Sequence, residues 1–252
     1  GKDSKVIGEA SSTVKVTIDE IIDDVTGGVV NGDVKNGLTN DNLPTFKGSA
    51  APGATVEIYE SFLTTTEKTL VGKTVADANG KWSFTPTEAM GDGLHYFEAH
   101  ATDSAGNKSI TPKVELDVDA TAPSVENLKV SPLDISNPAD NTPEKGRVEG
   151  SSDTQDAKVI VKDEAGNVIG EGKVGGDGKF SIDTTKALNP GDKVKVEIID
   201  EAGNTGKGSA VTGNDIIHTH ATTQVTIDEI YDDVAGGVVN GDVKNGLTND
   251  NL

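Results

Sequence analysis

Hydrophobic and polar positions alternate along much of the chain. Val56 and Ile58 are separated by polar neighbours, and Trp82 and Phe84 repeat the pattern further on. A period of two places hydrophobic side chains on one face of a β-strand, so the pattern predicts strands with one buried face. It predicts further buried rows at Val114, Leu116 and Val118, at Val159 and Val161, at Phe180 and Ile182, and at Val194, Val196 and Ile198.

Turn-forming residues separate these runs. Asp77-Ala-Asn-Gly80, Gly91-Asp-Gly93 and Asp103-Ser-Ala-Gly-Asn107 supply residues that tolerate a positive φ. The chain has 30 glycines and 9 prolines, and they interrupt any sustained helical period. Strands at this spacing, with no helices between them, predict an all-β fold of antiparallel β-sandwiches. The second stretch follows the same plan, with turns at Asp163-Glu-Ala-Gly-Asn167, Gly175-Gly-Asp-Gly178 and Asp200-Glu-Ala-Gly-Asn204.

A long repeat organises the chain. Residues 16–43 recur at 225–252, an offset of 209 residues, with differences only at Ile22/Tyr231 and Thr26/Ala235. A unit of this length holds about two ordinary domains, so the repeat predicts a piece of a longer tandem array. Copying a whole module adds length, valency or stiffness, whereas catalysis needs one good site.

The two stretches between the repeats predict two divergent copies of one domain. We place a linker at 1–14, an immunoglobulin-like sandwich at 15–119 and a second one at 120–213. Residues 214–252 are then a linker and the truncated start of a further repeat. A lone strand or two cannot bury its apolar face, so we expect this tail to be disordered or to pair with a neighbouring molecule. Alternatively, the repeated segment closes one domain instead of opening the next.

Charge narrows the classes of partner. The chain has 22 Lys and Arg against 42 Asp and Glu, a formal net charge of −20. Such a surface repels phosphates and anionic lipids, so we expect no nucleic-acid partner. No apolar stretch approaches the roughly 18 residues of a membrane span, so we expect no direct membrane insertion. The same charge attracts cations, and with no cysteine the chain has no disulfides.

Three runs stand out in domain one: Asn42-Leu-Pro-Thr-Phe-Lys-Gly48, Ala76-Asp-Ala-Asn-Gly-Lys-Trp-Ser-Phe-Thr-Pro86 and Ala101-Thr-Asp-Ser-Ala-Gly-Asn107. Domain two has the DEAGN turns and the linker that ends at Pro123. Together these segments resemble the bacterial immunoglobulin-like repeats of giant type I-secreted, biofilm-associated surface adhesins. The resemblance implies short linkers, an elongated rod and an extracellular location on the bacterial cell surface. It also implies that calcium ions at the junctions and neighbouring repeats hold the rod straight.

The best candidate cation site lies at the predicted domain boundary. Asp117 and Asp119 share one face of an extended strand, because residues two apart point the same way. Ca²⁺ takes several oxygen ligands, and neighbouring carboxylates meet part of that need. The F–G turn of an immunoglobulin-like domain lies at the end that the linker reaches, which brings Asp200 close. Asp177 is a further candidate there, and Asp103 occupies the corresponding place at the front of domain one. The alternative is that these aspartates only form turns on an acidic surface.

A second acidic cluster combines Asp19 and Glu20 with Asp23 and Asp24. Four acids in six residues repel one another unless a cation or a lysine intervenes, so Asp23 and Asp24 are candidate metal ligands. A solvated charge run explains the pattern equally well. The cluster recurs at Asp228, Glu229, Asp232 and Asp233.

Histidines are weaker candidates. His218 and His220 alternate onto one strand face and could hold a transition metal, but no third ligand is evident, which favours exposed linker histidines. His95 shares its face with Phe97 and Ala99, which favours a core position.

The leading hypothesis is a non-catalytic spacer stiffened by calcium, which we expect to be monomeric as a fragment. The alternative is a module that binds a glycan or a host receptor, with Tyr59, Phe62 and Tyr96 as outward aromatic candidates. An enzyme is disfavoured. The chain lacks a cysteine nucleophile, a glycine-rich phosphate loop, an HExxH motif and a recognisable nucleophile elbow.

Overall fold

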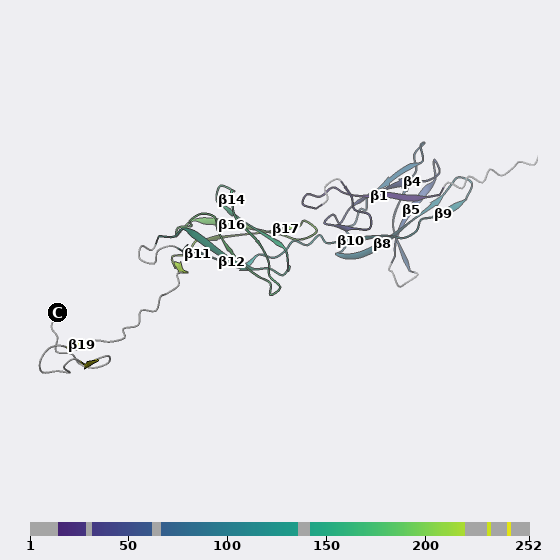
Figure 1. Ribbon diagram of the computed structural model, residues 1–252. Coiled ribbons are helices and arrows are strands. Elements are labelled where there is room, and N and C mark those ends of the chain that lie inside the picture. Colours follow the sequence, from purple (N-terminus) through teal and green to yellow (C-terminus); the bar gives the residue numbers. More distant parts are fainter. Residues whose placement is uncertain are drawn as a thin grey trace, which may run out of the picture.

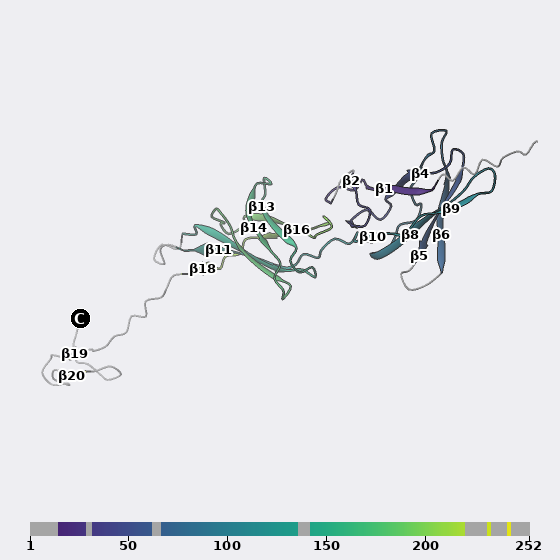
Figure 2. The same cartoon turned by 45° about the vertical axis from the view of Figure 1, so that its right-hand side comes forward.

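Two β-sandwiches follow one another along the chain and are joined by a single extended segment (Figures 1 and 2). The computed structural model describes residues 15–28, 32–61, 67–135, 142–219, 231–232 and 241–242. All of its regular elements in these ranges are strands. Within them, no helix of a length and hydrophobicity that would cross a membrane occurs. The predicted linker 1–14, Phe62 and His220 lie outside the described residues.

Strands β1 to β10 form the first sandwich. They are β1 (Thr17–Asp23), β2 (Gly32–Asp33), β3 (Leu38–Thr39), β4 (Thr45–Ser49), β5 (Thr55–Ser61), β6 (Lys68–Val75), β7 (Lys81–Phe84), β8 (Gly93–Thr102), β9 (Lys108–Ile110) and β10 (Val114–Val118). One sheet has the order β2-β1-β4-β7, and the other has β3-β10-β8-β5-β6 with β9 paired to β8. β3 runs parallel to β10, whereas β10 and β5 each run antiparallel to β8, which lies between them.

The alternating residues of the first sandwich fill the space between its sheets. Val56, Ile58 and Leu116 are fully buried, and Trp82 is 3% exposed. Phe84 and Val114 are partly buried and pack against this core. The predicted inward rows of domain one are therefore confirmed, with the two end positions closer to solvent.

Strands β11 to β18 form the second sandwich. They are β11 (Glu126–Asp134), β12 (Lys145–Ser151), β13 (Lys158–Asp163), β14 (Val168–Lys173), β15 (Lys179–Asp183), β16 (Lys193–Ile199), β17 (Thr205–Val211) and β18 (Ile217–His218). The two sheets have the orders β15-β12-β11-β18 and β14-β13-β16-β17. β18 pairs with β11 in parallel, so residues past position 213, where the sequence predicts the end of the domain, join this sandwich.

The second core is built from smaller side chains. Val159, Val161, Val194, Val196 and Ile198 are fully buried. The predicted rows of this domain are confirmed, including that of Phe180 and Ile182, which are 5% and 6% exposed. Each sandwich thus has a hydrophobic core of its own, and the predicted fold class of tandem antiparallel β-sandwiches is confirmed.

The long repeat has a structural counterpart near the C-terminus. β19 (Tyr231–Asp232) pairs with β20 (Gly241–Asp242), and Tyr231 lies opposite Asp242. In the first sandwich Ile22 lies opposite Asp33 in the same way, 209 positions earlier. The two nearly identical segments therefore form the same strand pair at these positions. Most of the tail for which we expect disorder or pairing lies outside the described residues.

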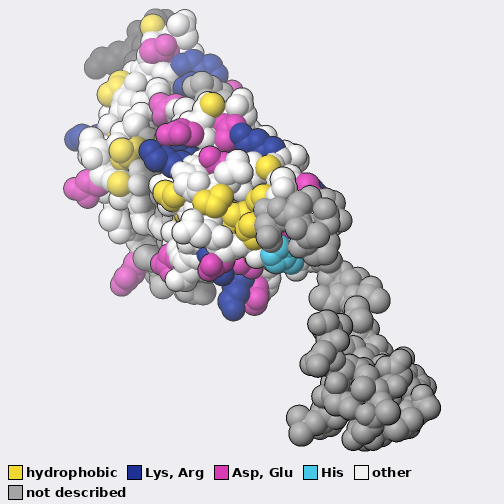
Figure 3. All heavy atoms as spheres, turned by 90° about the vertical axis from the view of Figure 1, so that its left-hand side faces the viewer, with side chains coloured by type: hydrophobic (Ala, Val, Ile, Leu, Met, Phe, Trp, Pro, Cys, Tyr) yellow, Lys and Arg dark blue, Asp and Glu magenta, His cyan; other side chains and the backbone are white. Residues whose placement is uncertain are grey.

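One face of the second sandwich shows how the charges are distributed. In the view of Figure 3, acidic and basic side chains are mixed over the visible surface, with small groups of hydrophobic side chains between them. The large net negative charge therefore does not make this face uniformly acidic.

Candidate metal site at the domain junction

Strand pairing brings two aspartates together where the chain leaves the first sandwich. β8 and β10 are antiparallel neighbours, and Val118 lies opposite Gly93. The residue before Gly93 is Asp92 and the residue after Val118 is Asp119, so these two flank the end of the same strand pair. Asp117 lies two positions before Asp119 on β10, as the sequence predicts.

Hydrogen bonds fix the segment that follows β10. The backbone N–H of Asp119 donates to the carbonyl oxygen of Thr39 at 2.9 Å. The backbone N–H of Ala120 donates to Oδ1 of Asp92 at 2.8 Å, and the hydroxyl of Thr121 donates to its Oδ2. The start of the linker is therefore held against the end of the first sandwich.

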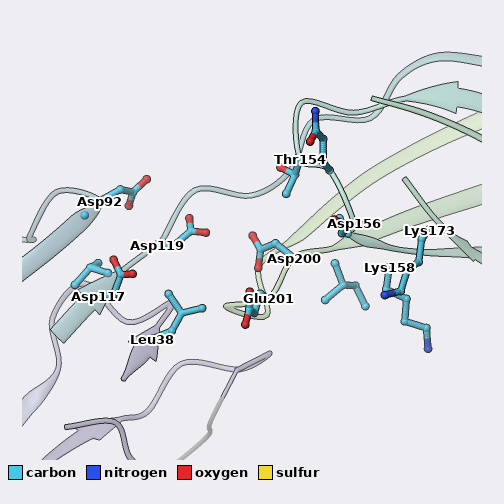
Figure 4. A pocket seen from close by; sticks show the side chains of 15 residues that line it. Leu38, Asp92, Asp117, Asp119, Thr154, Asp156, Lys158, Lys173, Asp200 and Glu201 are labelled. Carbon is cyan, nitrogen blue, oxygen red and sulfur yellow. The ribbon is translucent and has the colours of Figure 1, made fainter. Parts of the chain in front are cut away.

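The second sandwich contributes Asp200 from the turn between β16 and β17. The carboxylate of Asp200 organises this turn, because its Oδ1 accepts the backbone N–H groups of Gly203 at 2.7 Å and Asn204 at 2.8 Å. Asp92, Asp117, Asp119 and Asp200 line one open cavity of about 740 Å³ between the sandwiches. In Figure 4 Asp119 and Asp200 lie towards each other across this space, whereas Lys158 and Lys173 lie on its far side.

The carboxylates at the junction perturb one another. Burial raises the pKa of Asp119, and the negative charges of Asp200, Asp92 and Asp117 raise it further. The pKa of Asp92 is lowered instead, because the Thr121 hydroxyl and the Ala120 N–H stabilise its charged form. Burial and the neighbouring carboxylates therefore disfavour the charged form of Asp119.

The four aspartates at the junction have the oxygen ligands that a hard divalent cation prefers. Every side chain of this acidic group offers carboxylate oxygen, which Ca²⁺ prefers. Within the described residues, however, no three or more Asp, Glu, His or Cys side chains already lie in a metal-holding geometry. Both oxygens of Asp200 also accept hydrogen bonds from its own turn. The residues fit a cation in type and charge, and binding requires their carboxylates to draw together.

Two members of the second predicted cluster, Asp23 and Asp24, lie beside Thr39 and Asp41 at the same end of the first sandwich, whereas Asp19 and Glu20 line a different cavity with Lys81. Asp23 is fully buried; its Oδ2 accepts the hydroxyl of Thr39 at 2.7 Å and its Oδ1 accepts the N–H of Val25 at 2.9 Å. Asp24 is exposed, and its N–H donates to the buried carboxylate of Asp41 at 3.3 Å. Burial raises the pKa of Asp41, with further contributions from Asp24 and Asp23. The structure thus separates the cluster into a buried, hydrogen-bonded Asp23 and a solvated Asp24.

Two family models match the chain. Residues 15–120 match a bacterial Ig-like domain, and residues 137–215 match a bacterial Ig domain. The chain is a tandem of bacterial immunoglobulin-like domains. No curated protein matches it.

Solved structures resemble these Ig-like domains at low identity. One is described as "Biofilm associated protein - BSP domain" (19% identity, 71% of this chain and 29% of that chain, TM-score 0.26). Another is a "tetra-tandem repeat in extending region of large adhesion protein" (23%, 80% and 49%, TM-score 0.29). A third is a "Ca2+-stabilized adhesin" that "helps an Antarctic bacterium reach out and bind ice" (20%, 81% and 49%, TM-score 0.39). The chain spans between 29% and 49% of these structures, so the family assignment rests on the two family models.

Two predicted ligands lie away from the junction of the Ig-like domains. Asp103 is in the exposed turn after β8, at the opposite end of the first domain from Gly93. Its pKa is lowered by hydrogen bonds from the side chain and backbone of Asn107. Asp177 lines a different cavity, with Asn127 and Lys129, and its Oδ1 accepts the N–H of Lys179 at 3.1 Å. The structure therefore brings Asp117, Asp119 and Asp200 together but does not bring Asp177 to them.

The histidines and aromatic candidates have local partners. Nδ1 of His218 lies 3.2 Å from the buried carboxylate of Asp134. His95 is half-buried, stacks on Phe97 with 6.1 Å between ring centroids, and contacts Glu60. Tyr59 packs against the ring of His100 with 4.6 Å between centroids, so it does not project as a free aromatic contact.

Sequence reasoning missed three residues at this end of the first Ig-like domain. The sequence places Asp92 only in a turn, although the antiparallel pairing of β10 with β8, which begins at the next residue, places it beside Asp119. Asp41 and Asn40 follow β3 and are 3% and 6% exposed. Their signal is the parallel pairing of β3 with β10, which alternation alone does not reveal because β3 has only two residues.

Proposed function

We propose that these Ig-like domains are a non-catalytic extender of a bacterial surface adhesin, and that Ca²⁺ at the domain junction makes them a rigid rod. The observation that supports this most directly is the meeting of Asp92, Asp117 and Asp119 from one domain with Asp200 from the next around one cavity. The extracellular location and the projection of a distal adhesive domain belong to the same proposal. They rest on the family and on the resemblance of the sequence to adhesin repeats.

The mechanism is electrostatic. Without a cation the four carboxylates repel one another, and this repulsion favours arrangements in which the second domain moves away from the first. A bound Ca²⁺ supplies positive charge and takes six to eight oxygen ligands at about 2.3–2.6 Å. Asp119 and Asp200 then hold the linker and the turn after β16 in one geometry. Sites in extracellular modules bind calcium with dissociation constants of about 10⁻⁴–10⁻³ M, so the junction would be rigid in calcium-rich fluid.

Calorimetric titration with calcium and small-angle scattering test the proposal on the whole chain. We expect calcium to bind and to narrow the range of interdomain orientations seen in scattering, and a chelator to reverse the change. The double variant Asp117→Asn/Asp119→Asn should lose this response. Asp163→Asn is the matched control, because Asp163 begins the same type of turn as Asp200 but lies in a different cavity from the junction aspartates.

Two results contradict the proposal. Scattering profiles that coincide with and without chelator would show that no cation stiffens the junction. Equal calcium affinity in the parent and in the double variant would place the binding elsewhere in the chain.

A further inference from the structure

Three turns of this chain share one sequence pattern, Asp-x-Ala-Gly-Asn, and one internal geometry. They begin at Asp103, Asp163 and Asp200. In each, Oδ1 of the aspartate accepts the backbone N–H of the final asparagine, at 2.9, 2.9 and 2.8 Å. Each glycine has a positive φ, of 85°, 92° and 96° in chain order. The shape of the turn is therefore set by its own residues and not by its surroundings.

The third turn alone among these lies against the other domain. A Cβ atom built on Gly203 would overlap the backbone of Gly27 and Gly28. A Cβ on Gly27 would in turn overlap the carbonyl oxygen of Gly203. At the corresponding glycines of the other two turns, Gly106 and Gly166, nothing in the described structure lies within 4 Å of such an atom. The two domains thus meet backbone to backbone, at a distance that only glycine permits.

Two asparagines, Asn204 and Asn40, hold the two loops of this contact in place. The side-chain amide of Asn204 donates to the carbonyl oxygen of Asp119 at 2.6 Å, which ties the turn to the linker. On the opposite side Asn40 is 6% exposed, and its amide donates to the carbonyl oxygen of Thr26 at 3.2 Å. Its Oδ1 has no hydrogen-bond partner among the described residues and faces Gly28, at 3.1 Å from where a Cβ would lie.

We propose that the turn from Asp200 to Asn204 is a docking surface for a two-glycine loop on the preceding domain, Gly27-Gly28. This contact sets the mean interdomain angle without any cation, and the carboxylate repulsion widens the spread of angles around that mean. The surface is the Ala202-Gly203 edge of the turn, where Ala202 is 3% exposed. The partner it fits is a loop without Cβ atoms that packs against the buried Asn40, because a side chain on either loop would force the backbones apart. In this proposal the glycines of both loops determine which domains can be neighbours, and the carboxylates of the proposed calcium site act on the same junction through their charge.

The chain has no cysteine, so paired labels can be placed without background. Ser83 on β7 and Ser181 on β15 are exposed, one in each domain, and Ser83→Cys with Ser181→Cys gives two sites for spin labels. Distance distributions between the labels are measured by pulsed electron resonance in chelator, so that no divalent cation contributes. We expect Gly203→Ala to shift the mean distance and to broaden the distribution.

Gly106→Ala is the matched control. It places the same strained side chain in the same type of turn, but its Cβ meets nothing within 4 Å, so we expect an unchanged distribution. Asn204→Ala should broaden the distribution and Asn107→Ala should not, because Asn204 alone of the two reaches Asp119. An unchanged distribution in Gly203→Ala, or equal changes in Gly203→Ala and Gly106→Ala, would overturn the proposal.

Gly28→Ala decides the outcome if Gly203→Ala does not fold. Gly28 has no positive φ, so alanine adds no backbone strain there, but its Cβ would lie 2.5 Å from the carbonyl oxygen of Ala202. The same labels in calcium separate this proposal from the proposed function. A calcium response with no effect of Gly203→Ala or Gly28→Ala removes the docking surface and leaves the calcium site. If these variants change the distance distribution but calcium does not, the docking surface stands and the proposed calcium site is removed.

Discussion

The rings of Phe46 and Phe97 meet edge to face in the first domain, with centroids 4.8 Å apart and an interplanar angle of 66°. Phe46 comes from β4 and Phe97 from β8, so the contact joins the two sheets of the sandwich. Both side chains are fully buried. In a chain with only 4% aromatic residues this pair is a large share of the aromatic area in the core.

Phe46→Ala should therefore destabilise the first domain by about 3–5 kcal/mol, because it leaves a cavity between the sheets. Denaturant unfolding followed by tryptophan fluorescence measures this domain selectively, since Trp82 is the single tryptophan of the chain and lies in the first core. Val148→Ala in the second core is the control and should leave the Trp82 transition in place. A Phe46→Ala midpoint equal to that of the parent would contradict this account of the core.

The alternation of hydrophobic and polar residues and the positions of turn-forming residues predict most of the fold. Val56, Ile58 and Leu116 occupy the core as the period of two predicts, because each lies within a strand long enough to show the period. The two-residue strands β2, β3 and β18 carry no such signal, and tertiary pairing alone defines them. For this reason the sequence places the end of the second domain at residue 213, before β18.

The candidate site was predictable where ligands are close in sequence or follow from the order of strands. Asp117 and Asp119 form a DxD strand end, and Asp200 follows from the position of the turn after β16. Asp92 depends on strand register, which the sequence does not encode locally. The contact of Gly27 with Gly203 joins segments 176 residues apart through backbone atoms, so no side-chain pattern marks it.

Thr184 organises a buried part of the second domain. Its hydroxyl oxygen accepts the N–H of Gly146 at 2.7 Å and lies 2.6 Å from the carbonyl oxygen of Lys186, to which it donates. Thr184 is fully buried, so Thr184→Val keeps the shape but leaves these groups unpaired. We expect the free energy of unfolding to fall by about 1–3 kcal/mol for each buried group left without a partner. Thermal melting by circular dichroism measures it, and Thr184→Ser, which keeps the hydroxyl, should retain most of the stability. Equal melting of the valine variant and the parent would refute this role.

Thr39 links the buried carboxylate of Asp23 to the start of the junction. Its hydroxyl donates to Asp23 and accepts the N–H of Asp41 at 3.1 Å, and Thr39 is 1% exposed. Thr39→Val should destabilise the first domain by about 1–3 kcal/mol, because it leaves a buried carboxylate oxygen of Asp23 and the N–H of Asp41 without this partner. The Trp82 transition reports the loss. Thr69→Val on the exposed edge strand β6 should change stability by no more than about 0.5 kcal/mol. If calcium restores the stability of Thr39→Val, Asp23 is a cation ligand and not only a structural carboxylate.

Protonation of Asp119 at low pH should narrow the range of interdomain angles, as a bound cation is expected to do. Burial and then the charges of Asp200, Asp92 and Asp117 raise the pKa of Asp119 above that of an unfolded aspartate. Of these charges only that of Asp200 belongs to the second domain, so protonation of Asp119 removes a repulsion that opposes the closed junction. Because the pKa of Asp119 is raised, this contribution is fully present below about pH 4 and is lost as the pH rises through that pKa. In chelator, the label distances between positions 83 and 181 should therefore be narrower at about pH 4 than at pH 7.

The variant Asp119→Asn shows whether the pH dependence of the label distances comes from Asp119 or from titration of the rest of the acidic surface. The neutral amide cannot titrate, so the variant should show a narrow distribution at both pH values in chelator. Saturating calcium should remove the pH dependence of the parent over the range in which the ion stays bound. A distribution that does not change between the two pH values, or a variant that keeps the full pH dependence of the parent, would show that repulsion at Asp119 does not control the angle between the domains.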